Sequence, residues 1–268
     1  MLLSELESRL NLLLTPGEFK DFCPNGLIVK GSSGNPQVTS VVTGVSLRID
    51  LINWAIAKGS NVIFVHHPNG FWFSDKEKRV LDTQYGEYMR MLLQNRISLF
   101  GFHLPLDAHP TLGNNATVYN KLGLKGTVMQ FSDQLSDGSN FDDKPNLPDR
   151  FMEANIGFGG RGVITDELLR KVFPHGYQSF GFESGKEYKV AICTGSGTSE
   201  LEEARERGYN MFITGEIRES TPIYSAETGM AVIAAGHHRS EIFGVENIAN
   251  WLIENGVDAK FIDLDNPI

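Results

Sequence analysis

The sequence has 268 residues, of which 41% are hydrophobic and 21% are charged, and its formal net charge is -9. This length allows one large domain or two of ordinary size, and the composition excludes a disordered chain. The acidic balance excludes broad nucleic-acid or anionic-membrane binding through a basic face, but it leaves room for a small anionic substrate in a local cleft.

Cysteine usage and the absence of long apolar runs bear on the compartment. The two cysteines, Cys23 and Cys193, form no CxxC pattern, which favours a reducing compartment over a disulfide scaffold. The N-terminus has no basic region followed by an apolar run, and no stretch of about eighteen uncharged apolar residues occurs. We therefore expect a cytoplasmic protein without a membrane-spanning helix.

The first residues of the chain predict an amphipathic helix. Ser4-x-x-Glu7 has the spacing of a capping box, in which two side chains bind the free backbone groups at a helix start. Leu6, Leu10 and Leu13 recur at helical spacing and share one face, which we expect to be buried.

Two segments follow the same pattern, which predicts an internal duplication and an α/β fold. Residues 41–67 and 191–216 each read as a strand, a Thr-Gly turn, a helix closed by glycine, and a second strand. Apolar runs separated by helices predict βαβ units with parallel strands. The next apolar run and helix are 97–102 and 115–122 in the first copy, and 230–235 and 245–254 in the second.

The duplication divides the chain into two expected domains. Residues 1–125 form the first repeat, and residues 126–268 form the second domain, in which 189–268 is the repeat itself. The intervening residues 126–188 match neither repeat and predict a small α+β elaboration.

Three parts of this elaboration have readable patterns. Residues 133–150 predict an exposed loop, Thr165–Val172 a short helix, and 178–183 a strand. Gly157-x-Gly159-x-x-Gly162 matches a dinucleotide-binding fingerprint, but strand-like Val163-Ile164 follows where that fingerprint requires a helix. The motif therefore predicts a glycine-rich turn between strands.

Six of the seven histidines gather in three clusters, each at the expected end of a strand. A single cluster of this kind is ordinarily a hydrogen-bonded pair or a helical salt bridge, but their concentration favours a metal site built from imidazole and carboxylate. Ligands collect at the carboxyl ends of parallel strands, and a pseudo-twofold relation makes two of the clusters face each other across one cleft. The clusters are His66-His67, His103-x-x-x-Asp107 with His109, and His237-His238 with Glu241.

Two further features near these clusters have open interpretations. Glu216 occupies the repeat position of the His66-His67 pair, so it is either a carboxylate that anchors a ligand, a proton carrier, or a surface acid. Thr194–Ser199 is either an anion-binding turn or a plain strand-to-helix turn with Thr198 or Ser199 as N-cap.

Several motifs together resemble the Nif-three-like dinuclear-metal proteins, which are homologues of GTP cyclohydrolase I type 2. They cover the chain from about residue 20 to its end, and Pro68 departs from the glycine common after the double histidine. The carrying motifs are Pro24-Asn25-Gly26-Leu27-x-Val29, Thr43-Gly44-Val45, Val65-His66-His67, Gly101–Pro110 with Gly113-Asn114-Asn115, Thr214-Gly215-Glu216, and Gly236-His237-His238-x-x-Glu241.

The resemblance implies two interlinked α/β domains that bury two divalent metal ions between them, and a toroidal homohexamer. It implies that His67 and Asp107 bind one metal, that His66 and His237 bind the other, and that Glu241 bridges both. Iron, zinc and manganese all suit these ligands.

The expected function is a dinuclear metal-dependent hydrolase that acts on a nucleotide-like substrate. Glu216 and His103 are the candidates for proton transfer. The ligand types do not choose between GTP cyclohydrolase-like and phosphoesterase chemistry. The alternative is a non-catalytic metal-binding scaffold or metal-delivery protein.

Overall fold

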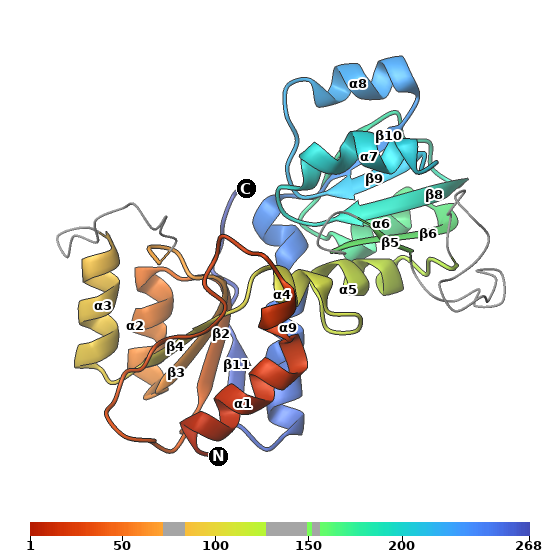
Figure 1. Cartoon of the computed structure of the whole chain (residues 1–268). Coiled ribbons are helices and arrows are strands. Elements are labelled where there is room, and N and C mark those ends of the chain that lie inside the picture. The colour runs from red at the N-terminus through yellow and green to blue at the C-terminus, as the bar shows by residue number, and fades with distance from the viewer. Residues whose placement is uncertain (72–83, 127–148, 152–155) are drawn as a thin grey trace. The chain divides into compact units, whose positions relative to one another are not determined.

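The computed structural model describes residues 1–71, 84–126, 149–151 and 156–268 (Figure 1). The chain folds as two compact units, and it passes from one unit to the other after Leu112, after Glu241 and after Asp265. Unit 1 comprises Met1–Leu112 and Ile242–Asp265, and unit 2 comprises Gly113–Glu241 and Asn266–Ile268.

This division differs from the expected boundary at residues 125 and 126. Residues 113–125, which belong to the first sequence repeat, fold with unit 2, and residues 242–265 of the second repeat fold with unit 1. Each unit thus contains chain from both repeats, which a boundary drawn at one point of the sequence does not capture.

Unit 1 contains a five-stranded sheet in the order β1-β4-β3-β2-β11. β2, β3, β4 and β11 run parallel, whereas β1 pairs with β4 in the antiparallel direction. The predicted parallel strands of the first copy are therefore confirmed. The strands are β1 (Gly26–Val29), β2 (Val41–Ser46), β3 (Val62–His67), β4 (Ser98–Gly101) and β11 (Ala259–Phe261).

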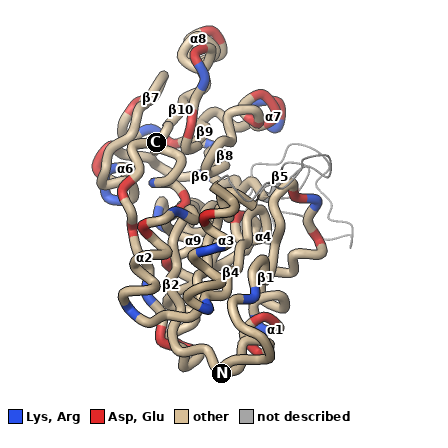
Figure 2. The backbone as a smooth tube through the Cα atoms, turned by 90° about the vertical axis from the view of Figure 1, so that its left-hand side faces the viewer, with Lys and Arg blue, Asp and Glu red and all other residues tan. Residues whose placement is uncertain are grey.

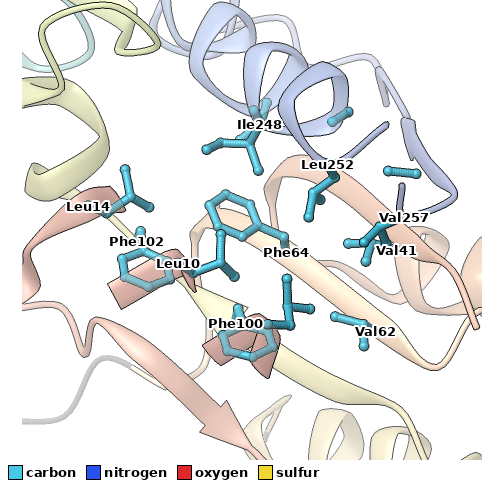
Figure 3. Packing of buried hydrophobic residues seen from close by; sticks show 14 of the residues in the cluster. Leu10, Leu14, Val41, Val62, Phe64, Phe100, Phe102, Ile248, Leu252 and Val257 are labelled. Carbon is cyan, nitrogen blue, oxygen red and sulfur yellow. The ribbon is translucent and has the colours of Figure 1, made fainter. Parts of the chain in front are cut away.

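Helices cover both faces of this sheet. Successive side chains of a buried strand point to opposite sides, so each face carries apolar residues that the helices bury. Phe64 of β3 packs in one core with α1 and α9, as Figure 3 shows around Leu10, Phe64 and Leu252. Ile63 packs in a second core with α2 and α3. The helices are α1 (Leu3–Leu14), α2 (Ile49–Lys58), α3 (Gln84–Gln94) and α9 (His237–Glu254), which begins in unit 2.

The predicted N-terminal helix is present, but it starts earlier than expected. Leu2 is the N-cap residue of α1, and the Glu5 carboxylate accepts a hydrogen bond from the Leu2 backbone N–H at 2.8 Å. The capping box predicted from Ser4 and Glu7 is therefore wrong, since Ser4 already lies inside the helix. The predicted apolar face is confirmed: Leu6 and Leu10 are buried and Leu13 packs against the same core.

Unit 2 contains a six-stranded sheet in the order β5-β6-β8-β9-β10-β7. β8, β9 and β10 are parallel, as predicted for the second copy, and the remaining pairings are antiparallel. The strands are β5 (Asp149–Phe151), β6 (Gly157–Ile164), β7 (Gln178–Phe180), β8 (Lys186–Cys193), β9 (Met211–Thr214) and β10 (Ala231–Ala234). The helices are α5 (Asn114–Lys121), α6 (Asp166–Val172), α7 (Leu201–Glu206) and α8 (Thr221–Thr228).

The two sheets share one strand order over four strands, β1-β4-β3-β2 in unit 1 and β7-β10-β9-β8 in unit 2. Within each set of four, the strand that comes first along the chain, β1 or β7, is the antiparallel neighbour of the last, β4 or β10. The units also exchange helices: α5 follows β4 but folds with unit 2, and α9 follows β10 but continues in unit 1 from Ile242. The shared strand order is compatible with the internal duplication, which stays a prediction from the sequence.

The elaboration before β8 departs from its prediction in one respect. The glycine motif lies inside β6 and not in a turn. A Cβ at Gly159 would lie 1.9 Å from the Tyr209 hydroxyl, and one at Gly160 would lie 2.6 Å from the Tyr119 ring, so these glycines make room for aromatic side chains.

The segment before β8 also contains a predicted helix, a predicted strand and a predicted loop. The helix predicted from Thr165 is confirmed as α6, with the Thr165 hydroxyl accepting from the Leu168 N–H at 3.1 Å. The predicted strand 178–183 is shorter and ends at Phe180. The predicted loop covers residues 133–150, of which 133–148 lie outside the described residues and the last two belong to β5.

Two further properties concern the described residues. None of the helices placed in the structure has the length and apolar character needed to cross a membrane. Basic and acidic positions are interspersed along the backbone, as Figure 2 shows for the ranges drawn in colour.

Candidate metal centre

The double histidine of unit 1 occupies the last two positions of β3. The predicted cluster is therefore part of the strand and does not follow it. His66 is fully buried and His67 is 6% exposed, because β3 is a central strand flanked by β2 and β4. Two adjacent buried imidazoles at the carboxyl end of a parallel strand are costly unless their ring nitrogens bind partners.

The ring of His66 is oriented by two contacts. Its Nδ1 lies 2.9 Å from the Phe102 carbonyl oxygen, which only accepts, so Nδ1 carries the proton. Its Nε2 lies 3.4 Å from Oδ2 of Asp107, a buried carboxylate on α4 (Leu104–Ala108). In the neutral ring Nε2 bears a lone pair, so two electron-rich atoms face each other. A cation, either a proton or a metal ion, resolves this repulsion.

His67 and His103 complete the unit 1 cluster, which we define as His66, His67, His103 and Asp107. One ring nitrogen from each of the three histidines lies within 4.8 Å of the others, a spacing that suits ligands of one ion. Nδ1 of His67 also lies 3.2 Å from the Ser46 hydroxyl at the end of β2. Imidazole and carboxylate at this spacing fit iron, zinc or manganese.

The turn of residues 21–25, which precedes β1, holds His103, the N-cap residue of α4. Nδ1 of His103 lies 3.0 and 3.1 Å from the two carboxylate oxygens of Asp21, whose side chain is 1% exposed. The same carboxylate accepts from the backbone N–H of Leu104 and from Asn25, and the Asn25 side-chain oxygen accepts from the His103 N–H at 2.7 Å. The turn thus fixes both the backbone and the ring of His103.

These contacts change the acid–base behaviour of Asp21. Burial by itself would raise its pKa, but the hydrogen bond and charge of His103, together with hydrogen bonds from Asn25 and the Cys23 N–H, lower the pKa from 3.8 to about 2. Because the folded pKa is depressed, its contribution to stability is present above pH 3.8 and is lost as the pH falls through about 2.

Acid unfolding is expected to report this contribution. Between pH 5 and pH 2 the free energy of unfolding of the native protein should fall by about 2 kcal/mol more than that of Asp21→Asn, which has no carboxylate to protonate. Urea titrations at a series of pH values measure the difference. Equal pH slopes for the two proteins would contradict the low pKa of Asp21.

Unit 2 repeats the arrangement found at His66. We define the unit 2 cluster as Glu216, His237 and Glu241. Nδ1 of His237 lies 2.6 Å from Oε1 of Glu216, and Nε2 lies 3.2 Å from Oε2 of Glu241, which is 3% exposed. As in unit 1, one ring nitrogen meets an oxygen acceptor while the other faces a buried carboxylate, so a cation is again required.

In the absence of metal that cation is a proton. Burial lowers the pKa of His237, but the hydrogen bonds and charges of Glu241 and Glu216 outweigh it and raise the pKa from 6.5 to about 9. This contribution to stability is therefore complete below pH 6.5 and lost as the pH rises through about 9. Because a metal ligand must lose this proton, metal binding competes with protonation.

Two glycines leave room around this histidine. Gly195 follows β8 with a positive φ of 66°, and a Cβ there would lie 2.2 Å from Oε1 of Glu241. Gly215 follows β9, and a Cβ there would meet the Gly195 carbonyl oxygen at 2.6 Å. Gly195 therefore gives the Glu241 carboxylate room, and Gly215 gives room to the turn after β8.

The turn Thr194–Ser199 binds Glu216. The Ser196 hydroxyl donates to Oε2 of Glu216 at 3.1 Å, and the Thr198 hydroxyl donates to the Glu216 carbonyl oxygen. The N-cap role predicted for Thr198 or Ser199 is wrong, because a 3₁₀ turn (Gly197–Glu200) comes first and α7 starts only at Leu201.

Some of the predicted site residues have neighbours other than those expected from the sequence. Asp107 lies beside His66, whereas the resemblance implied a pairing with His67. His109 binds the backbone N–H of Leu112 through Nδ1 and serves the turn after α4. The sequence interpretation missed the role of Asp21. Its only signal was that Asp21 precedes a Pro-Asn-Gly motif.

Comparison with known proteins places this architecture in a family. The family model Duf34/NIF3 (NGG1p interacting factor 3) matches residues 1–267, and the chain belongs to this family. A Haemophilus influenzae protein and an Escherichia coli K12 protein, both named GTP cyclohydrolase 1 type 2 homolog, are 35% and 36% identical, with 98% of this chain and of each relative covered. A solved structure described as protein ybgI of unknown function is 32% identical with a TM-score of 0.80, covering 100% of both chains.

Proposed function

We propose that this protein is a metal-dependent hydrolase in which the unit 1 and unit 2 clusters together form one centre for two divalent ions. The observation that carries the proposal is the repeated pair of a histidine Nε2 and a buried carboxylate, at 3.4 Å for His66 and Asp107 and at 3.2 Å for His237 and Glu241. Each pair needs a cation, and the other ring nitrogen is already held by an oxygen acceptor, as is usual for histidine ligands.

Chain connectivity supports a shared centre. Glu241 is the last residue of unit 2 before the chain enters unit 1, and Asp107 lies five residues before the crossing at Leu112. A chain spans at most about 3.6 Å per residue, so Asp107 and Glu241 each lie near a point at which the chain passes from one unit to the other. α5 begins seven residues after Asp107, and α9, which contains Glu241, continues in unit 1 from Ile242.

In the proposed centre His66 and Asp107 would hold one ion, His67 and His237 would hold the other, and Glu241 would serve both. Divalent ions held in this way lower the pKa of a water molecule and polarise a phosphate or carbonyl oxygen. The residues of the chain orient the ligands: the Phe102 carbonyl oxygen fixes the ring of His66, and Glu216 fixes the ring of His237. His103, held by Asp21, remains the candidate for proton transfer.

The names of the relatives support a nucleotide-like substrate. Proteins that align over 98% of the chain are named GTP cyclohydrolase 1 type 2 homolog. With a net charge of -9, the protein is expected to attract an anionic nucleotide mainly through its bound cations.

Metal analysis tests the centre directly. Protein reconstituted anaerobically with iron, zinc or manganese should contain two ions per chain, and fewer than about one would contradict a dinuclear centre. The loaded protein should hydrolyse GTP with formate release, or an aryl phosphodiester. Two bound ions without turnover of any nucleotide or phosphoester would instead favour the metal-binding scaffold or metal-delivery alternative.

The family resemblance also leads us to propose a homohexamer in the cytoplasm. Light scattering of the purified protein at micromolar concentration should give about six times the 29.7 kDa mass of one chain. A stable monomer under these conditions would contradict the ring.

A further inference from the structure

The carboxylate of Asp21 contacts the ring of His103 as well as the start of α4. The carboxylate is inaccessible to solvent and accepts only from donors: the His103 ring, the N–H groups of Cys23 and Leu104, and the Asn25 amide. The backbone of His103 is already held through Asn25, at 2.7 Å. The contact between the carboxylate and the ring therefore determines something beyond backbone position, namely which way the imidazole faces and which nitrogen bears hydrogen.

A carboxylate that touches Nδ1 selects one form of the ring. Because Asp21 has no proton to donate, Nδ1 must be the N–H donor, and in the neutral ring Nε2 is left with the lone pair. The ring of His103 lies 5.2 Å from that of His66 and 5.6 Å from that of His67 between centroids. The nitrogen opposite Asp21 is thus the one that His103 can offer to a ligand or substrate at the unit 1 cluster.

We propose that Asp21 is a positioning residue of the centre, which holds His103 as the Nδ1–H tautomer so that Nε2 is the acceptor available beside His66 and His67. Its effect on turnover rests on the proposed hydrolase function. Its effect on the tautomer does not, and this separates the two tests.

The tautomer is measured first, in metal-free protein with ¹⁵N-labelled histidine. Long-range ¹H–¹⁵N spectra should show His103, assigned by loss of its signals in His103→Gln, with hydrogen on Nδ1. In Asp21→Asn the amide nitrogen is able to donate to Nδ1, so the ring should move toward the Nε2–H form. An Nε2–H ring in the native protein, or no change in the variant, would overturn the proposal. The native measurement stands even where Asp21→Asn fails to fold.

Kinetics then test the consequence. With both proteins saturated with the same metal, and with GTP and bis(p-nitrophenyl) phosphate as probes, Asp21→Asn should lower kcat by roughly 10- to 100-fold with little change in KM. Asp21→Glu, which keeps an acceptor-only side chain, should recover part of the loss. The matched control is Asp166→Asn, which removes an exposed carboxylate bonded to Arg170 and Tyr177 and should leave kcat unchanged.

The tautomer measurement and the kinetic measurement test separate claims. A kcat that is unaffected in a variant with an altered tautomer would remove Asp21 from the mechanism. If the native protein turns over neither probe, the hydrolase proposal loses its support from these substrates, while the tautomer result still decides whether Asp21 positions His103.

Discussion

Replacing Glu241 with glutamine is expected to strip the centre of metal more completely than any other single substitution. Glu241 is buried at 3% exposure, its Oε2 lies 3.2 Å from Nε2 of His237, and Gly195 leaves room for its other oxygen. In the proposed centre it contacts both ions, so the neutral amide withdraws negative charge from two cations at once. Metal content should fall below about one ion per chain under conditions that fill the native protein, and turnover should be lost with it.

Elemental analysis after gel filtration measures this loss, and Glu246→Gln is the matched control. Glu246 lies on the same helix, α9, but is exposed to solvent, so its replacement removes the same charge without touching either cluster. Native metal content in Glu241→Gln would show that the carboxylate is not a ligand. A similar loss in both variants would show that net charge, and not ligation, controls uptake.

Much of the fold was predictable because apolar runs and glycine-closed helices report local structure directly. The parallel strands of both copies and the helix from Thr165 were placed correctly from the sequence. The exchange of α5 and α9 between units was not, since the sequence of a helix specifies an apolar face but not which sheet that face covers. The glycines of β6 were misread for a related reason: their partners, Tyr119 and Tyr209, are distant in sequence.

The candidate site, like the fold, was predictable only in part. Histidine clusters at strand ends were visible because ligand-type residues concentrate there, and the structure brings His66, His103 and Asp107 together in unit 1. The residues that orient them were not visible. Asp21 is 82 positions from His103, and an isolated aspartate has no pattern that distinguishes a buried clamp from a solvated loop residue.

Glu216→Gln is expected to weaken metal binding more than it slows the chemical step. The sequence left Glu216 open as anchor, proton carrier or surface acid, and its contacts favour the anchor. One oxygen lies 2.6 Å from Nδ1 of His237 and the other accepts from the Ser196 hydroxyl, so both are engaged in orienting a ligand. A glutamine oxygen at position 216 still accepts a hydrogen bond from the Nδ1–H of His237. The neutral amide lacks the negative charge of glutamate, which makes Nε2 of His237 a stronger ligand for the ion. Loss of such a partner costs roughly 10- to 100-fold in metal affinity.

Metal titration with turnover measured at each concentration separates the roles of Glu216. If it is an anchor, the concentration for half-activation should rise by roughly 10- to 100-fold, while kcat at saturating metal stays near the native value. A proton carrier would give the opposite result: native metal affinity with kcat lowered by roughly 100-fold or more. Glu219→Gln, an exposed acid three residues along the same segment, should change neither quantity. If Glu216→Gln also changes neither, the 2.6 Å contact with His237 has no functional consequence, and His103 becomes the sole remaining candidate for proton transfer among the residues proposed from the sequence.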